Sequence, residues 1–208
     1  MHKLKSLPAH GGAIGEQVEI RLAFEAPQEP NGYMKPRPVM AGILMMLLLG
    51  CATPERKAAE QQLRHTAAKD LFEQAAKRYD LPAADLQGAE KMRLLDLAAA
   101  GYEKVLKQYP DEKFWCAQAL RSLGNVRAVQ GRLDDAVKIW VRVEKEYPQQ
   151  DWEVLLAWRS AANQLWDAGR KDEAREFYRK IVEQFDNGVE PTVIRLIVQG
   201  AKPRLVGD

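Results

Sequence analysis

One residue pattern recurs three times between residues 98 and 186, at a constant interval of 38 residues. It consists of a small residue, an aromatic residue four positions later, an aliphatic residue three later and a second aromatic residue four later. The three sets are Ala98, Tyr102, Val105, Tyr109; Ala136, Trp140, Val143, Tyr147; and Ala174, Tyr178, Ile181, Phe185. Steps of three and four place all members on one helix face. The chain is therefore expected to fold as stacked helical units, which bury faces that no single unit can bury.

Each patterned helix is expected to follow a partner helix. The segment Gly131-Arg132-Leu133-Asp134-Asp135-Ala136 matches Gly169-Arg170-Lys171-Asp172-Glu173-Ala174. The glycine is predicted to close the first helix of the pair, because it adopts positive φ without steric cost. The acidic pair then stands in the first turn of the second helix, where it complements the helix dipole. We interpret these acids as capping groups rather than as an acid/base pair.

These helical pairs resemble the tetratricopeptide repeat (TPR), clearly over residues 117–148 and 155–186 and partly over residues 53–110. The resemblance implies an all-α, TPR-like solenoid of about three helical hairpins over residues 55–189. The first helix is expected at residues 55–79, before a long loop at residues 80–88. Each unit exceeds the usual length of about 34 residues. The extra residues fall in the loops after Tyr109 and Tyr147, as in envelope TPR lipoproteins such as those of outer-membrane barrel assembly.

The C-terminal segment, residues 190–208, carries an apolar run from Val193 to Val198. A short final helix that covers the last repeat is the simplest interpretation, and Pro191 suits a first helical turn. A strand or a partner-binding tail stays open, because a continuous apolar run does not distinguish helix from strand.

The N-terminal region carries a second informative motif at residues 34–51. Lys35 and Arg37 precede an uncharged run, Val39 to Leu49, which is too short to span a bilayer but suits a signal peptide. The run ends in Leu48-Leu49-Gly50-Cys51, which resembles the lipobox of bacterial lipoproteins. That resemblance implies cleavage after Gly50, a diacylglycerol on the Cys51 sulfur and an acyl chain such as palmitate on the new amino group.

The resemblance also implies a location. Ala52, rather than Asp, follows the lipidated cysteine, which favours the periplasmic face of the bacterial outer membrane. Residues 34–50 are then the signal peptide and residues 51–54 a lipidated linker. Residues 1–33 have no periodic apolar pattern, and we expect translation to begin at Met34; a long disordered leader is the alternative. Any peptide from residues 1–33 in the unprocessed precursor would contradict the later start.

Composition narrows the possible functions of residues 51–208. They carry 26 Lys plus Arg and 25 Asp plus Glu, a balance that does not favour nucleic acid. His65 is their only histidine, so no metal site and no histidine-based nucleophile are expected. We expect His65 to be solvated and Cys116 to be a packed residue. The chain is predicted not to be an enzyme and to need no cofactor beyond the covalent lipid.

A candidate binding groove emerges from a short duplication. Arg121-Ser122-Leu123-Gly124-Asn125 and Arg159-Ser160-Ala161-Ala162-Asn163 lie 38 residues apart. In TPR folds the first helix of each pair lines the concave groove, so the resemblance places both Arg-Asn sets there. Arg can grip a carboxylate bidentately, and Asn can bond a peptide backbone. Trp166 would extend this groove as an aromatic anchor.

We expect this groove to bind an acidic peptide, and removal of both arginines to leave stability nearly unchanged. The alternative is structural: the asparagines are a common TPR choice, the arginines pair with local acids, and Trp166 belongs to the core. The function expected is that of a membrane-anchored lipoprotein whose repeats bind another envelope protein. A scaffold or accessory subunit of an envelope assembly, secretion or pilus machine, and a carboxylate-based hydrolase, are the alternatives.

Overall fold

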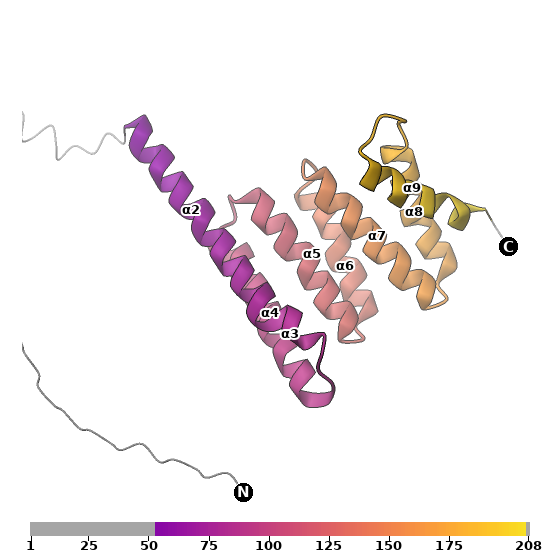
Figure 1. The fold of residues 1–208 in the computed structure, drawn as a ribbon, viewed down its shortest axis with the longest axis horizontal. Helices are drawn as coiled ribbons and strands as arrows, with labels where there is room; N and C mark the ends of the chain where they lie inside the picture. Colours follow the sequence, from indigo (N-terminus) through magenta and orange to yellow (C-terminus); the bar gives the residue numbers. More distant parts are fainter. Residues whose placement is uncertain (1–52, 207–208) are drawn as a thin grey trace, which may run out of the picture. The chain divides into compact units, whose positions relative to one another are not determined.

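The computed structural model describes residues 53–206, and all the regular secondary structure in this range is helical (Figure 1). The first described element is the long helix α2 (Pro54–Ala75), which continues through a π-helical turn, η1 (Ala76–Asp80), and a short helix, α3 (Leu81–Ala83). The remaining helices are α4 (Gly88–Gln108), α5 (Lys113–Val129), α6 (Leu133–Glu146), α7 (Asp151–Asp167), α8 (Lys171–Phe185) and α9 (Thr192–Leu205). The all-α, TPR-like solenoid is thus confirmed. None of the described helices is long and apolar enough to cross a bilayer.

Three hairpins follow one another, each packed on the next. The first hairpin pairs α2 with α4, the second α5 with α6 and the third α7 with α8. In each hairpin the patterned helix contributes the recurring buried set, from Ala98 in α4 to Ile181 in α8. Helix α5 supplies residues to two core clusters, one shared with α2 and α4 and one that extends to α9. A continuous core therefore runs through the stack.

The turns inside the second and third hairpins form as the glycines predict. Gly131 and Gly169 have φ of 77° and 78°. The Arg132 amide donates to the Arg127 carbonyl (2.9 Å), and the Gly131 amide donates to the Ala128 carbonyl (2.9 Å). These two bonds form a Schellman motif, which satisfies carbonyl groups at the helix end. The next hairpin repeats the arrangement, so the two helical pairs turn alike.

The first hairpin differs from the sequence-based expectation. The long loop predicted at residues 80–88 is wrong, because helical structure continues through Ala83. Pro82 does not end the helical structure, since proline is tolerated in a first helical turn. The π-helical turn places Asp80 against α4, where its carboxylate accepts a hydrogen bond from the Tyr102 hydroxyl (2.7 Å).

The C-terminal run forms helix α9, as the simplest interpretation proposed, and not a strand. Val198 and Ala201 are buried against α8, whereas Val193 and Leu196 are 51% and 62% exposed. Helix α9 therefore covers the last repeat with one face and presents a second apolar face outward. The predictions for the leader, the signal peptide and Cys51 concern residues outside the described range.

Candidate functional site

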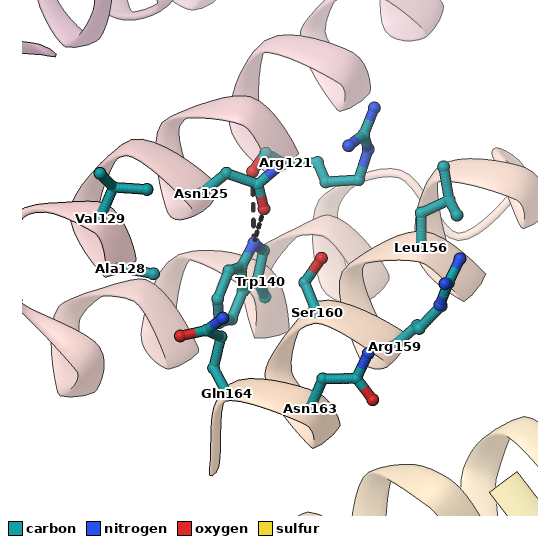
Figure 2. Close-up of a pocket in the computed structure, with 10 residues that line it drawn as sticks. All are labelled: Arg121, Asn125, Ala128, Val129, Trp140, Leu156, Arg159, Ser160, Asn163 and Gln164. Carbon is teal, nitrogen blue, oxygen red and sulfur yellow. Dashed lines mark hydrogen bonds between the residues drawn. The ribbon is translucent and has the colours of Figure 1, made fainter. Parts of the chain in front are cut away.

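We call the first helix of each hairpin the inner helix and the second the outer helix. Two hollows lie along the inner helices, and both are lined by Arg159 and Asn163. The first hollow lies between α5 and α7, has a volume of about 380 Å³ and is drawn in Figure 2. It is lined by Arg121, Asn125, Ala128, Val129, Trp140, Leu156, Arg159, Ser160, Asn163 and Gln164. The second hollow lies between α7 and α9 over α8 and has the same volume. It is lined by Arg159, Asn163, Tyr178, Ile181, Val193, Leu196, Ile197, Gly200, Ala201 and Arg204.

The structure thus brings together four of the five side chains that the sequence predicted for a groove. Arg121 and Asn125 reach it from α5, and Arg159 and Asn163 reach it from α7 (Figure 2). Their spacing of four residues puts each pair on one helix face. The shared residues join the two hollows into one groove, which α9 extends beyond the duplicated motif.

The two arginines have different surroundings. The Arg121 Nε donates to Glu153 Oε2 at 2.5 Å, and the exposed fractions of these side chains are 19% and 2%. The second carboxylate oxygen of Glu153 is buried and has no hydrogen-bond partner among the described residues. Arg121 therefore neutralises a buried carboxylate of α7. The expectation that Arg121 can be removed without loss of stability conflicts with this pairing, because a buried charge without its partner is costly.

Arg159 lacks such a partner. It is exposed, and no hydrogen bond, ion pair or ring contact joins it to another residue between positions 53 and 206. Its guanidinium therefore keeps its donors for a ligand. Of the duplicated arginines, this is the one whose surroundings suit recognition of an external carboxylate.

The two asparagines each hold a buried aromatic side chain. The Asn125 Oδ1 accepts from the Trp140 Nε1 (3.2 Å), as the dashed lines of Figure 2 show, and the Asn163 Oδ1 accepts from the Tyr178 hydroxyl (2.9 Å). These bonds favour the structural alternative for the asparagine oxygens. The amide NH₂ groups are not used in these bonds and remain as donors toward the groove.

Trp166 lines neither hollow. Its ring is partly buried against the core, beside Tyr178, and the Arg204 guanidinium carbon lies 4.4 Å from its centroid. Lys171 and Arg175 also lie within cation–π distance of the ring. The indole thus makes cation–π contacts instead of lining the groove. The groove residue that the sequence did not predict is Arg204. No repeat signal marks Arg204, because α9 lies beyond the last copy of the pattern.

His65 is not simply solvated, contrary to the sequence-based expectation. Its Nδ1 lies 3.0 Å from Glu112 Oε2, and its Nε2 accepts a hydrogen bond from Trp115 Nε1 (3.3 Å). The ring therefore links α2 to the start of α5. No local sequence signal marks this contact, since its partners lie 47 and 50 positions away.

The remaining candidates occupy structural positions. Cys116 is fully buried, donates to the Tyr109 carbonyl, and burial raises the pKa of its thiol. In the acidic pairs, Asp135 and Glu173 bind Arg132 and Arg170 within their own helix starts. The hydrogen bond from Arg170 lowers the pKa of the Glu173 carboxyl. Among residues 53–206, no group of three or more His, Cys, Asp or Glu is placed to hold a metal ion.

Comparison with known proteins matches tetratricopeptide-repeat family models to residues 87–151 and to residues 157–188. The first match contains α4, α5 and α6, and the second contains most of α7 and all of α8. Helix α9 lies beyond both matches. A search of curated proteins found no significant match.

Proposed function

The chain is a tetratricopeptide-repeat protein, and from that premise we propose that it is a lipid-anchored protein of the bacterial outer membrane that binds another envelope protein through its inner groove. Tetratricopeptide repeats support a role in protein–protein interaction. The single observation that carries the proposed binding is Arg159, an exposed cation without a partner among residues 53–206, beside Asn163 in a groove of the inner helices. An acidic segment of the partner is the ligand class that these groups fit.

Proximity crosslinking in intact envelopes tests the groove. A photo-crosslinking amino acid, p-benzoyl-phenylalanine, replaces Gln164, which is exposed and lines the first hollow. The matched control places the same amino acid at Lys138, which is exposed on the outer helix α6. We expect a discrete protein adduct from position 164 and none from position 138. Equal adducts from both positions, or none from position 164, would contradict the proposal.

The membrane anchor rests on the sequence Leu48-Leu49-Gly50-Cys51 after an apolar run. Replacement of Cys51 with Ala is expected to release the protein from the membrane fraction or to leave it as a larger precursor. Replacement of Cys116 with Ala is the control, because that thiol is buried in the repeat domain. Normal processing and continued partition into detergent of the Cys51→Ala variant would sink the lipoprotein assignment.

A further inference from the structure

The second hairpin shows how this fold neutralises an inner arginine. Arg121 of α5 forms an ion pair with the carboxylate of Glu153, which lies on the next inner helix, α7. One repeat later, the residue that corresponds to Glu153 is Pro191, directly before α9. Proline has no carboxylate, so Arg159 lacks the acid that its counterpart has. Glu190 is buried but makes no ion pair with Arg159 in the part of the chain that the structure describes.

A second cation lines the same hollow as Arg159. Arg204 of α9 lines the second hollow together with Arg159. Its guanidinium carbon lies 4.4 Å from the centroid of the Trp166 ring, and no carboxylate pairs with it within residues 53–206. A cation–π contact leaves the guanidinium N–H groups for hydrogen bonds. Two cations and the NH₂ group of Asn163 therefore line a single hollow, and no acid is among the described residues that line it.

The other side of this hollow is apolar and uncovered. Val193 and Leu196 are more than half exposed, and Ile197 continues the same side of α9. Gly200 leaves additional space, since a Cβ built on it would meet no atom within 4 Å. Exposed aliphatic residues beside fixed donors are the usual makeup of a recognition site.

We propose that the second hollow binds a segment of the partner protein that carries one glutamate directly beside an aliphatic residue. The glutamate carboxylate lies against Arg159 and Arg204, as Glu153 lies against Arg121, and the aliphatic side chain packs on Val193 and Leu196. This inference rests on the proposed function, because it specifies the ligand of the same inner groove. It commits to an internal acidic side chain, so a basic segment or an uncharged one is a test outcome that contradicts it.

A pair of synthetic peptides tests the charge requirement. The probes are fluorescein-labelled, blocked at both ends and differ at one position: Gly-Ser-Leu-Glu-Leu-Ser-Gly and its glutamine counterpart. Fluorescence anisotropy with the full chain in detergent gives both dissociation constants. We expect the glutamate peptide to bind about tenfold more tightly, because it alone makes charge-assisted hydrogen bonds. Equal affinities, or no binding of the glutamate peptide, would overturn the inference.

Variants of the protein then locate the binding site. Arg204→Gln should weaken the glutamate peptide about tenfold and leave the glutamine peptide nearly unchanged, since a coupling of this kind appears only when both partners are present. Arg142→Gln, which removes a guanidinium from the outer helix α6, is the matched control and should bind both peptides as the unchanged chain does. Loss of both peptides to the same extent in Arg204→Gln would contradict a contact with the carboxylate.

A size series at Gly200 tests the apolar side independently of charge. Affinity for the glutamate peptide should fall stepwise from Gly200→Ala to Gly200→Leu to Gly200→Phe as the added side chain fills the second hollow. Urea midpoints of the three variants should not fall, since every replacement has a higher helix propensity than glycine. Unchanged peptide affinity in Gly200→Phe would place the ligand elsewhere. Partner adducts at Gln164 combined with this result would overturn the inference while the proposed function stands.

Discussion

The second and third hairpins have the same repeat pattern, yet they use its polar residues differently. In the second, Arg121 forms an ion pair with Glu153, and Gly124 leaves space for the Trp140 indole. In the third, Arg159 has no acid within residues 53–206, and the residues that correspond to Gly124 and Trp140 are Ala162 and Tyr178. The same sequence motif thus stabilises the fold in one hairpin and remains available to a ligand in the next. The difference arises from the helix that follows each hairpin, α7 in one case and α9 in the other.

The largest expected difference separates the two arginines. Arg121→Ala should lower the free energy of unfolding by about 3 kcal/mol, because it leaves the buried Glu153 carboxylate without a partner. Arg159→Ala should change it by less than about 0.5 kcal/mol, since the side chain is exposed and bonds nothing among the described residues. Urea unfolding measures both. Similar losses in the two variants would erase the distinction between a structural and a free arginine.

The next effect concerns the close approach of the paired helices. A Cβ at Gly124 would overlap the Trp140 indole, so Gly124→Ala should cost about 1–3 kcal/mol of unfolding free energy. In the third hairpin the corresponding residue, Ala162, already carries a Cβ, and the residue that corresponds to Trp140 is a tyrosine. Replacing Trp140 with Tyr in the Gly124→Ala background should therefore recover part of the loss. No recovery in the urea midpoint would show that the indole is not the obstacle.

A smaller contrast separates the two asparagines. Asn163→Ala should cost about 1–2 kcal/mol, because the half-buried Tyr178 hydroxyl loses the only bond it makes to a described residue. Asn125→Ala should cost less, since the Trp140 Nε1 also donates to the Arg121 carbonyl (3.2 Å). Thermal or urea unfolding of the two variants decides the order. The reverse order would contradict this account of the bonds.

The smallest effect brings the first hairpin into the comparison. Its aromatic residue, Tyr102, bonds a carboxylate, Asp80, where the other two hairpins use asparagine. Burial raises the pKa of Asp80, and the bond from Tyr102 offsets part of that rise. The folded state therefore binds this proton more tightly than the unfolded state. The stability that the group contributes is present at low pH and lost as pH rises through the raised pKa.

Asp80→Asn removes this dependence and keeps an oxygen for the Tyr102 hydroxyl. The variant should therefore gain stability relative to the unchanged chain as pH rises from about 4 to 7, by less than about 1 kcal/mol. Urea midpoints of both proteins across this range give the difference directly. A difference that does not grow with pH would show that the Asp80 carboxylate carries no burial cost.

Local spacing was sufficient to predict much of the fold. The 38-residue pattern placed the buried faces of α4, α6 and α8, and the glycines at 131 and 169 placed two turns. Steps of three and four residues follow from helix geometry and need no tertiary information. The π-helical turn before α3 was missed, because no residue type marks it.

Only part of the candidate site could be predicted from the sequence, because spacing along a helix does not show which helix packs beside it. The spacing of four residues put each Arg-Asn pair on one helix face, and the resemblance to tetratricopeptide repeats placed both pairs in one groove. Only the tertiary structure decided which arginine is already paired, because Glu153 approaches from another helix. It also decided that Trp166 supports Arg204 and that α9 completes the second hollow. Repeat spacing fixes positions along a helix, whereas the charge left for a ligand depends on which helix packs next.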